Sequence, residues 1–149
     1  MAIKLTQKEA DMLIEMLKKT VAKEIELPSG KGRVEFDVTG DRKEDVFVVN
    51  ISRKGINENS ASYQGRVRYG SGAILMRLDV NPTQPHRNPD GEKISSTHIH
   101  MYTEEYGERM AVPFDIENKD LFELCYSFFE RFNIIEPPSV TEQLKFSEV

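Results

Sequence analysis

The feature that most constrains the fold is a long middle segment in which apolar and polar residues alternate. Between residues 33 and 114 this alternation returns in six short runs, and turn-forming residues stand between them. Such alternation predicts β-strands with one apolar face. The runs that we expect to form strands are 33–38, 45–52, 62–69, 73–80, 97–103 and 109–114. Because short turns join neighbouring runs, we expect a largely antiparallel sheet.

Patterns typical of helices lie on both sides of this segment. Thr6 and Glu9 have the spacing of a capping box, and Asn118 has the properties of a helix N-cap. Apolar residues follow each of them at helical spacing. They are Ala10, Leu13, Ile14, Leu17 and Val21 after the first, and Leu121, Phe122, Cys125, Phe128, Phe129 and Phe132 after the second. We therefore predict helices at about 6–25 and about 118–133, with a polar tail at 137–149.

These elements together predict an α+β fold. We expect an antiparallel sheet of about five or six strands, at about 33–114, with both helices packed on one face. The residues that would form the apolar face are Ile74, Met76, Leu78, Val80, Ile99 and Met101. The chain has 149 residues, which is the usual size of one domain, and no repeat or long linker divides it. We expect a single domain over residues 1–149.

Composition narrows the class of protein further. With 38% hydrophobic and 30% charged residues, the chain has the composition of a globular protein rather than a disordered one. Its single cysteine, Cys125, excludes an internal disulfide and fits a reducing compartment. No stretch approaches the roughly 18 apolar residues of a membrane span. We expect a cytoplasmic protein without a membrane partner.

The net charge of −5 argues against a protein that coats nucleic acid, which would normally be basic. The charge is unevenly distributed, however. The segment from Arg53 to Arg87 has six basic residues, and its only acidic residues are Glu58 and Asp79. This segment fits either a solvated face of the sheet or a local anion-binding site within an acidic protein.

Polar residues with chemical functions interleave with the predicted apolar face. Since side chains alternate along a strand, these residues point to the opposite face. They are Arg77 and Asp79 in one run and His98, His100 and Tyr102 in another, joined by Arg66 and Arg68 if Val67 faces the helices. The Cβ atoms of His98 and His100 are expected roughly 6–7 Å apart on one solvent-facing surface. Two imidazoles at this spacing can converge on one metal ion or one phosphate.

The third histidine, His86, precedes a strong turn signal, Asn88-Pro89-Asp90-Gly91. This turn could fold His86 back toward His98 and His100. An alternative is that the three histidines are only hydrogen-bonded on a half-exposed sheet face. The sequence has no Cys-x-x-Cys or His-Glu-x-x-His motif that would favour a metal site.

Three consecutive segments resemble the signature of a small uncharacterised bacterial family. The segments are LMRLDVN, PHRNPDG and THIHMYTEEYGERMAVPF, and the resemblance covers roughly 74–114. The residues that carry it are Arg77, Leu78, Asp79, His86, Asn88, Pro89, Asp90, Gly91, His98, His100 and Tyr102. A shorter similarity links the His-x-His strand to small toxin-like proteins. The resemblance supports the fold and the choice of residues, and it implies no particular reaction.

The first functional hypothesis is a small enzyme that cleaves phosphodiesters, as RNase toxins do. Such cleavage needs a base, an acid and cations that stabilise the transition state. His98 and His100 would be base and acid, Tyr102 would orient them, and Asp79 would hold one imidazole's tautomer. The residues that would bind phosphate are Arg66, Arg68 and Arg77. In a variant of this hypothesis, His86, His98 and His100 bind a divalent transition metal with an open position for water.

The second hypothesis is a binding or inhibitor module without chemistry, as encoded by mobile elements or used in phage–host conflict. Its polar sheet face would bind the partner, either RNA or another protein. The small size and the acidic charge suit this hypothesis. The sequence leaves open whether a cofactor is bound at all.

Overall fold

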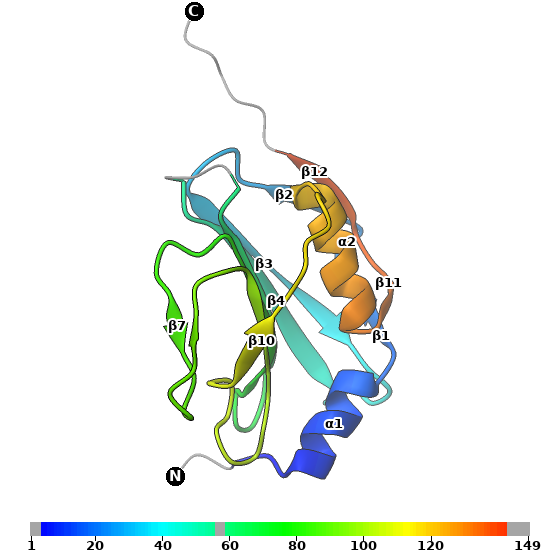
Figure 1. The fold of residues 1–149 in the computed structure, drawn as a ribbon. Helices are drawn as coiled ribbons and strands as arrows, with labels where there is room; N and C mark the ends of the chain where they lie inside the picture. Colours follow the sequence, from blue (N-terminus) through cyan, green and yellow to red (C-terminus); the bar gives the residue numbers. More distant parts are fainter. Residues whose placement is uncertain (1–3, 56–58, 143–149) are drawn as a thin grey trace, which may run out of the picture.

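A computed structural model describes residues 4–55 and 59–142, and it is built around a mixed eight-stranded sheet (Figure 1). The strands of this sheet are β1 (Lys18–Thr20), β3 (Gly32–Thr39), β4 (Val46–Arg53), β5 (Ala61–Val67), β6 (Ile74–Val80), β9 (His98–Met101), β10 (Ala111–Pro113) and β11 (Ile134–Glu136). Their order is β10-β9-β6-β5-β4-β3-β1-β11. Neighbours are antiparallel except β1 and β11, which are parallel.

Two smaller sheets complete the β-structure. β2 (Glu24–Leu27) pairs in parallel with β12 (Ser139–Glu142), and β7 (His86–Arg87) pairs antiparallel with β8 (Lys93–Ile94). The predicted polar tail therefore contains strand β12. Residues 143–149 of that tail lie outside the described part of the chain, and so does Glu58 of the predicted basic segment. Among the described residues, no helix has the length and apolar character needed to cross a membrane.

The two helices are α1 (Gln7–Glu15) and α2 (Leu121–Arg131), and each begins with a complete capping box. Thr6 and Glu9 form the first box, as predicted. The N-cap of the second helix is Asp120 and not Asn118, because Asp120 accepts a hydrogen bond from the Glu123 backbone N–H. Asn118 instead has a left-handed backbone, with φ 61°, in the turn before the helix. Asparagine and aspartate are both among the commonest N-cap residues, so residue type alone does not decide between Asn118 and Asp120.

The prediction of one helix over 6–25 is wrong in its second half. The helix ends at Glu15, and the predicted apolar stripe ends with it, since Leu17 and Val21 are 57% and 66% exposed. Residues 18–20 form β1 instead, which pairs on one side with β3 and on the other with β11. Hydrogen bonds to strands distant in sequence therefore override a local pattern that favoured a helix.

The sheet has an apolar face covered by helices and an opposite face covered by the β7–β8 hairpin (Figure 1). On the helical side, the rings of Phe36 and Phe129 and those of Phe47 and Phe132 meet edge to face at 5.8 Å. Gly65 makes room for this packing, because a Cβ atom there would lie 2.7 Å from the Phe132 ring. The predicted core residues Met76, Leu78, Val80 and Ile99 are buried on this side, and Met101 packs against them. Ile74 is only partly buried, and its neighbour Leu75 joins the core instead.

The strand count and the antiparallel order were only partly predicted. All six predicted runs form strands, at β3, β4, β5, β6, β9 and β10. The additional strands have two to four residues each, which is too short for an alternating pattern to be recognised. The parallel pairings involve β1, within the predicted first helix, and β12, within the predicted tail. Their partners β11 and β2 lie at or just after the predicted ends of the two helices.

A fully buried lysine connects the ends of the two helices. The Lys18 ammonium group donates hydrogen bonds to the carbonyl oxygens of Ile14, Met16 and Phe132, at 2.9–3.0 Å. It also lies over the ring of Phe132, 4.1 Å from the centroid. Three carbonyl acceptors match the three N–H bonds of an ammonium group, whereas burial acts against its charge and lowers the pKa of Lys18 to about 7. Lys18 therefore provides a donor for the Met16 and Phe132 carbonyls, while the Ile14 carbonyl also accepts from Asn133 Nδ2 at 3.0 Å.

We expect Lys18→Met to lower the free energy of unfolding by about 2–4 kcal/mol, because methionine leaves the Met16 and Phe132 carbonyls without the donor that Lys18 provides, whereas the Ile14 carbonyl keeps another donor, Asn133 Nδ2. The matched control is Lys19→Met, since Lys19 is exposed and makes only a surface ion pair with Glu136 at 3.8 Å. The control should change stability by less than about 0.5 kcal/mol. Urea unfolding of both variants measures this, and equal stabilities would contradict the role assigned to Lys18.

Candidate functional site

The candidate site lies where β6 and β9 run side by side on the face opposite the helices. The register pairs Asp79 with His98 and Arg77 with His100. Because these residues alternate with the buried Leu78 and Ile99, their side chains share the polar face, as predicted. The sheet thus places one carboxylate, one guanidinium and two imidazoles in direct contact.

One oxygen of Asp79 is the meeting point of the site. Asp79 Oδ2 lies 3.3 Å from His98 Nε2, 3.2 Å from His100 Nε2 and 3.2 Å from Arg77 Nε. The other oxygen, Oδ1, accepts a hydrogen bond of 2.8 Å from the Ser62 hydroxyl on β5. The Ser62 contact fixes the carboxylate so that Oδ2 faces both histidines.

The carboxyl group of Asp79 is held in its ionised form. Burial acts to raise its pKa, but the hydrogen bond that His100 donates when its ring is protonated, the charge of Arg77 and the hydrogen bond from Ser62 together hold the pKa of Asp79 well below its usual range. Asp79 is therefore a carboxylate at any physiological pH. A carboxylate is a hydrogen-bond acceptor and a metal ligand, and it cannot itself donate a proton.

Backbone carbonyls orient both imidazoles. His98 Nδ1 lies 2.8 Å from the Ser96 carbonyl oxygen, and His100 Nδ1 lies 2.7 Å from the Glu108 carbonyl oxygen. A carbonyl oxygen only accepts, so each Nδ1 carries a proton and donates it. In the neutral form of each ring, Nε2 therefore has a lone pair, and this lone pair points toward Asp79. Hydrogen bonding of this kind is how proteins set the tautomer of histidine ligands to metals.

The surroundings of His100 Nε2 cannot all be favourable at once. This atom lies 3.0 Å from Arg77 Nη2, which is a donor, and 3.2 Å from Asp79 Oδ2, which is an acceptor. If His100 is neutral, its Nε2 accepts a hydrogen bond from Arg77, but the same lone pair then faces the lone pairs of the Asp79 carboxylate. If His100 is protonated, its Nε2–H donates a hydrogen bond to Asp79, but this proton then faces the N–H protons of Arg77. A cation among Asp79, His98 and His100 would convert the opposed lone pairs into ligands.

The geometry of the three acceptor atoms suits a small metal ion. Asp79, His98 and His100 each offer one ligand atom, and these atoms lie within 4.8 Å of one another. Metal–ligand distances of about 2.0–2.1 Å at tetrahedral angles separate two ligand atoms by about 3.3 Å. The observed oxygen–nitrogen distances of 3.2 and 3.3 Å match that separation for two of the three pairs, and the two histidine nitrogens lie within 4.8 Å of each other. Two imidazole nitrogens and one carboxylate oxygen form a common ligand set for transition metals.

His86 covers this group from the β7–β8 hairpin. Its ring lies 4.6 Å from the His100 ring and 5.4 Å from the His98 ring, measured between centroids. Its Nε2 lies 2.9 Å from Asn88 Oδ1 and 2.8 Å from the Arg109 carbonyl oxygen, so Nε2 is a donor. The predicted return of His86 is confirmed. His86 was also predicted as a metal ligand, but the three residues whose ligand atoms converge are Asp79, His98 and His100.

Asn88 fixes the position of the hairpin. It is buried, and its Oδ1 accepts from the Ala111 backbone N–H while its Nδ2 donates to the Ala111 carbonyl, at 2.9 and 2.8 Å. The amide orientation is therefore determined by the backbone of β10. Asn88 in turn orients His86. The sequence placed Asn88 in a turn and did not show this pairing.

The prediction that His98 and His100 face solvent is wrong. Their side chains are 2% and 0% exposed, although they point away from the helices. The sequence showed which face they occupy but not that the segment between β6 and β9 returns across that face. Asp79 and Arg77 remain 20% and 27% exposed, so solvent reaches the site through these two residues.

Three other predicted site residues lie elsewhere. Tyr102 follows the end of β9, where alternation no longer applies, and its hydroxyl donates to the Leu5 carbonyl within the core. Arg68 pairs with Asp37 of β3 at 3.0 Å. Arg66 is on the polar face, half-buried, but makes no contact with the histidines. Of the residues predicted to bind phosphate, only Arg77 joins the site.

Ser62 is a site residue that the sequence analysis missed. It pairs with Asp79 in the β5–β6 hairpin. Counting outward from the turn between the two strands would not have identified Ser62, because a bulge at Gly65 and Arg66 shifts the register by one residue.

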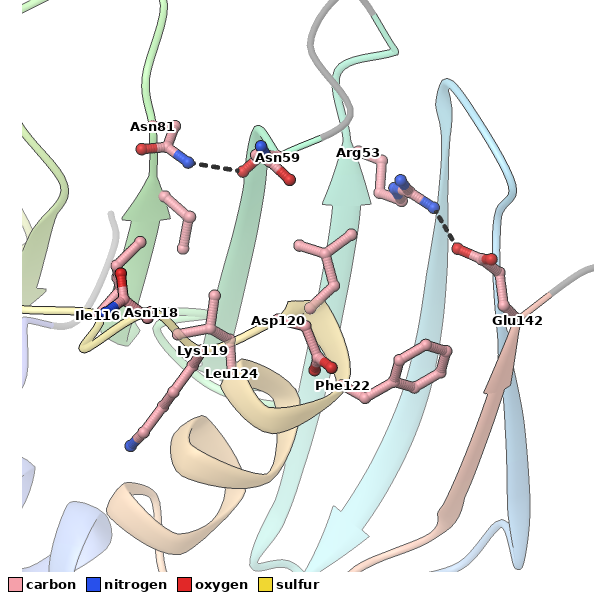
Figure 2. Close-up of a pocket in the computed structure, with 12 residues that line it drawn as sticks. Arg53, Asn59, Asn81, Ile116, Asn118, Lys119, Asp120, Phe122, Leu124 and Glu142 are labelled. Carbon is pink, nitrogen blue, oxygen red and sulfur yellow. Dashed lines mark hydrogen bonds and ion pairs between the residues drawn. The ribbon is translucent and has the colours of Figure 1, made fainter.

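A groove of about 430 Å³ opens beside Asp79 and Arg77 on the polar face. Its other lining side chains include Ser52, Lys54 and Gln64 from β4, β5 and the turn after β4. A second cavity of about 420 Å³ lies at the start of α2, on the helical side (Figure 2). There the polar groups bind one another, as in the Arg53–Glu142 ion pair at 2.9 Å. The first groove borders the candidate site through Arg77, Asp79 and Ser62.

Comparison with known proteins identifies a family. The sequence profile of a family of unknown function, DUF6978, matches residues 5–134. The chain belongs to this family. The match includes Ser62, Arg77, Asp79, His86, His98 and His100, and it ends at the first residue of β11. Searches of curated proteins and of solved structures find no match to the chain.

The hydrogen bonds predict different tautomers for the three histidines. In the neutral state of each ring, His98 and His100 should carry the proton on Nδ1, whereas His86 should carry it on Nε2. Two-bond ¹⁵N–¹H correlation spectra of the metal-free protein distinguish these forms, and His86 is the internal control. A proton on Nε2 of neutral His98 or His100 would contradict the assignment, because it would occupy the direction of the other ligands.

Proposed function

We propose that this protein binds one divalent transition-metal ion through Asp79, His98 and His100, and that the metal promotes hydrolysis of a phosphoester. The observation that carries the proposal is the convergence of the Asp79 carboxylate oxygen and the Nε2 atoms of His98 and His100, each of which has a lone pair in the neutral ring because its Nδ1–H is bonded to a backbone carbonyl. With neutral rings, acceptor atoms that face one another in this way need a cation between them, either a proton or a metal ion.

Zinc is the metal that we expect to bind first. Two imidazoles and one carboxylate are the protein ligands of several catalytic zinc sites, in which the fourth position holds water. The same set also binds iron(II) and other first-row ions, so selectivity depends on geometry and availability. The absence of a nearby thiolate argues against a closed structural site of the Cys-rich type, since the only cysteine, Cys125, is in the helical core.

The proposed reaction follows from the surroundings of the ligands. A metal ion with three protein ligands lowers the pKa of a bound water and generates a hydroxide nucleophile near neutral pH. Asp79 and Arg77 line the groove, so a substrate there would lie beside the metal ligand and a fixed guanidinium. The guanidinium would stabilise negative charge that develops on a phosphoryl group. RNA is one substrate with such a bond.

Metal-free acid–base cleavage by His98 and His100 is less well supported. Both rings are buried, and each already uses Nδ1 for a backbone carbonyl. The remaining nitrogen of each ring faces Asp79 rather than the groove. A base must come within hydrogen-bond distance of the proton that it removes, and here the carboxylate occupies that direction.

A second candidate function is a binding module in which the metal is structural. The burial of His98 and His100 supports it, because a metal bound by Asp79, His98 and His100 would join β6 to β9 without needing a substrate. The two functions differ in activity, not in metal content. Release of nitrophenol from bis-p-nitrophenyl phosphate by the zinc-loaded protein favours the enzyme, and full inertness toward this ester and RNA favours the module.

Zinc binding should depend on the three ligands and much less on His86. We expect one zinc ion per chain, with an affinity lowered by at least about 100-fold in Asp79→Ala, His98→Ala and His100→Ala, because each substitution removes a ligand. His86→Ala is the matched control, since it removes an imidazole from the same cluster, and it should lower the affinity by about tenfold or less. Titration calorimetry on untagged protein measures each affinity.

Thermal unfolding separates lost ligands from lost folding. Zinc at about 1,000 times its dissociation constant should stabilise the wild type by about 4 kcal/mol. At the same zinc concentration the ligand variants, with affinities lowered at least about 100-fold, should gain no more than about 1.4 kcal/mol, even if they are less stable from the start. Equal stabilisation of wild type and His100→Ala, or a lack of zinc binding by the wild type, would contradict the proposed metal site.

A further inference from the structure

The geometry points to a coupled site in which metal binding releases Arg77 from His100, so that Arg77 and Lys54 bind the phosphoryl group of an ester in the adjacent groove. This inference rests on the metal site proposed above and adds the substrate class and the order of binding. It concerns the groove of about 430 Å³ on the polar face.

Arg77 and a metal ion would compete for the same atoms. Arg77 Nη2 lies 3.0 Å from His100 Nε2, and Arg77 Nε lies 3.2 Å from Asp79 Oδ2. A metal bound to His100 Nε2 uses the lone pair that otherwise accepts from Arg77. It also repels the guanidinium by its charge. Since the Arg77 side chain is 27% exposed and lines the groove, the guanidinium can turn outward once the metal is bound.

The groove is suited to an anion. Its charged lining residues are Lys54, Arg77 and Asp79. With a divalent ion on Asp79, these charges change from one excess positive charge to three. Among the described residues, Lys54 Nζ and the Gln64 amide make no hydrogen bond or ion pair, so both donors are available to a ligand.

The lining also indicates which part of a substrate is recognised. None of the groove residues in the described part of the chain is aromatic, so stacking of a nucleobase has no support there. Hydroxyl and amide side chains predominate instead, including Ser52, Gln64, Thr83 and Gln84. These groups can bind phosphoryl and sugar oxygens. The volume is adequate for a nucleotide-sized ester.

Thermodynamic linkage makes the inference testable without an enzyme assay. If metal binding releases Arg77, phosphate should bind more tightly to zinc-loaded protein than to metal-free protein, by about tenfold. Zinc alone attracts phosphate, so the decisive variant is Arg77→Gln. This variant should keep less than about one third of the gain in phosphate affinity, and it should bind zinc at least as tightly as the wild type because it no longer competes for His100.

The experiment is a calorimetric titration of inorganic phosphate into zinc-loaded protein freed of excess zinc, and into metal-free protein. The matched control is Arg68→Gln, which makes the same charge change on an arginine paired with Asp37 outside the groove. It should behave as the wild type does. Lys54→Gln should weaken phosphate binding and reduce its salt dependence.

Two further ligands identify the ester. Adenosine 5′-monophosphate tests a phosphomonoester, and the dinucleotide ApA tests a phosphodiester; zinc-dependent binding of either supports the inference. Binding of free phosphate alone would overturn it. An Arg77→Gln variant with the full gain, or with weaker zinc binding, would also overturn it while the metal site stands. If the wild type binds no zinc, both the metal site and the coupling fail.

Discussion

The site depends on a single carboxylate oxygen that two imidazoles and a guanidinium share. Asp79 Oδ2 lies 3.2–3.3 Å from three nitrogen atoms, and no arrangement of protons makes all of these contacts favourable. Ser62 holds the carboxylate from one side, and the carbonyls of Ser96 and Glu108 hold the imidazoles from the other. The sheet therefore maintains acceptor atoms at a separation that a metal ion would stabilise.

The rest of the fold maintains this arrangement. The helical face supplies the apolar core, in which Phe132 packs against Gly65 and Lys18 joins the ends of both helices. On the opposite face, Asn88 fastens the β7–β8 hairpin to the backbone of Ala111 and holds His86 over the site. Burial of His98 and His100 comes from this hairpin, while access through Arg77 and Asp79 is kept on the groove side.

Local patterns in the sequence predicted the parts of the fold that depend on nearest neighbours. Alternation located the six central strands and placed Asp79, His98 and His100 on one face, because strand periodicity fixes side-chain direction. Short strands paired with distant segments were missed, since two to four residues show no period. Tyr102 was assigned to the site because alternation was extended past the end of β9, where it no longer holds. The burial of the histidines depends on a returning hairpin, which no local pattern encodes.

The most direct test of the account is a crystal structure of the zinc-loaded protein, with anomalous diffraction at the zinc absorption edge. We expect one anomalous peak about 2.0–2.2 Å from Asp79 Oδ2, His98 Nε2 and His100 Nε2. Both Nδ1–carbonyl hydrogen bonds should be retained, and Arg77 Nη2 should have moved away from His100. A peak at other residues, or a fully loaded crystal in which Arg77 still contacts His100 Nε2, would contradict the account.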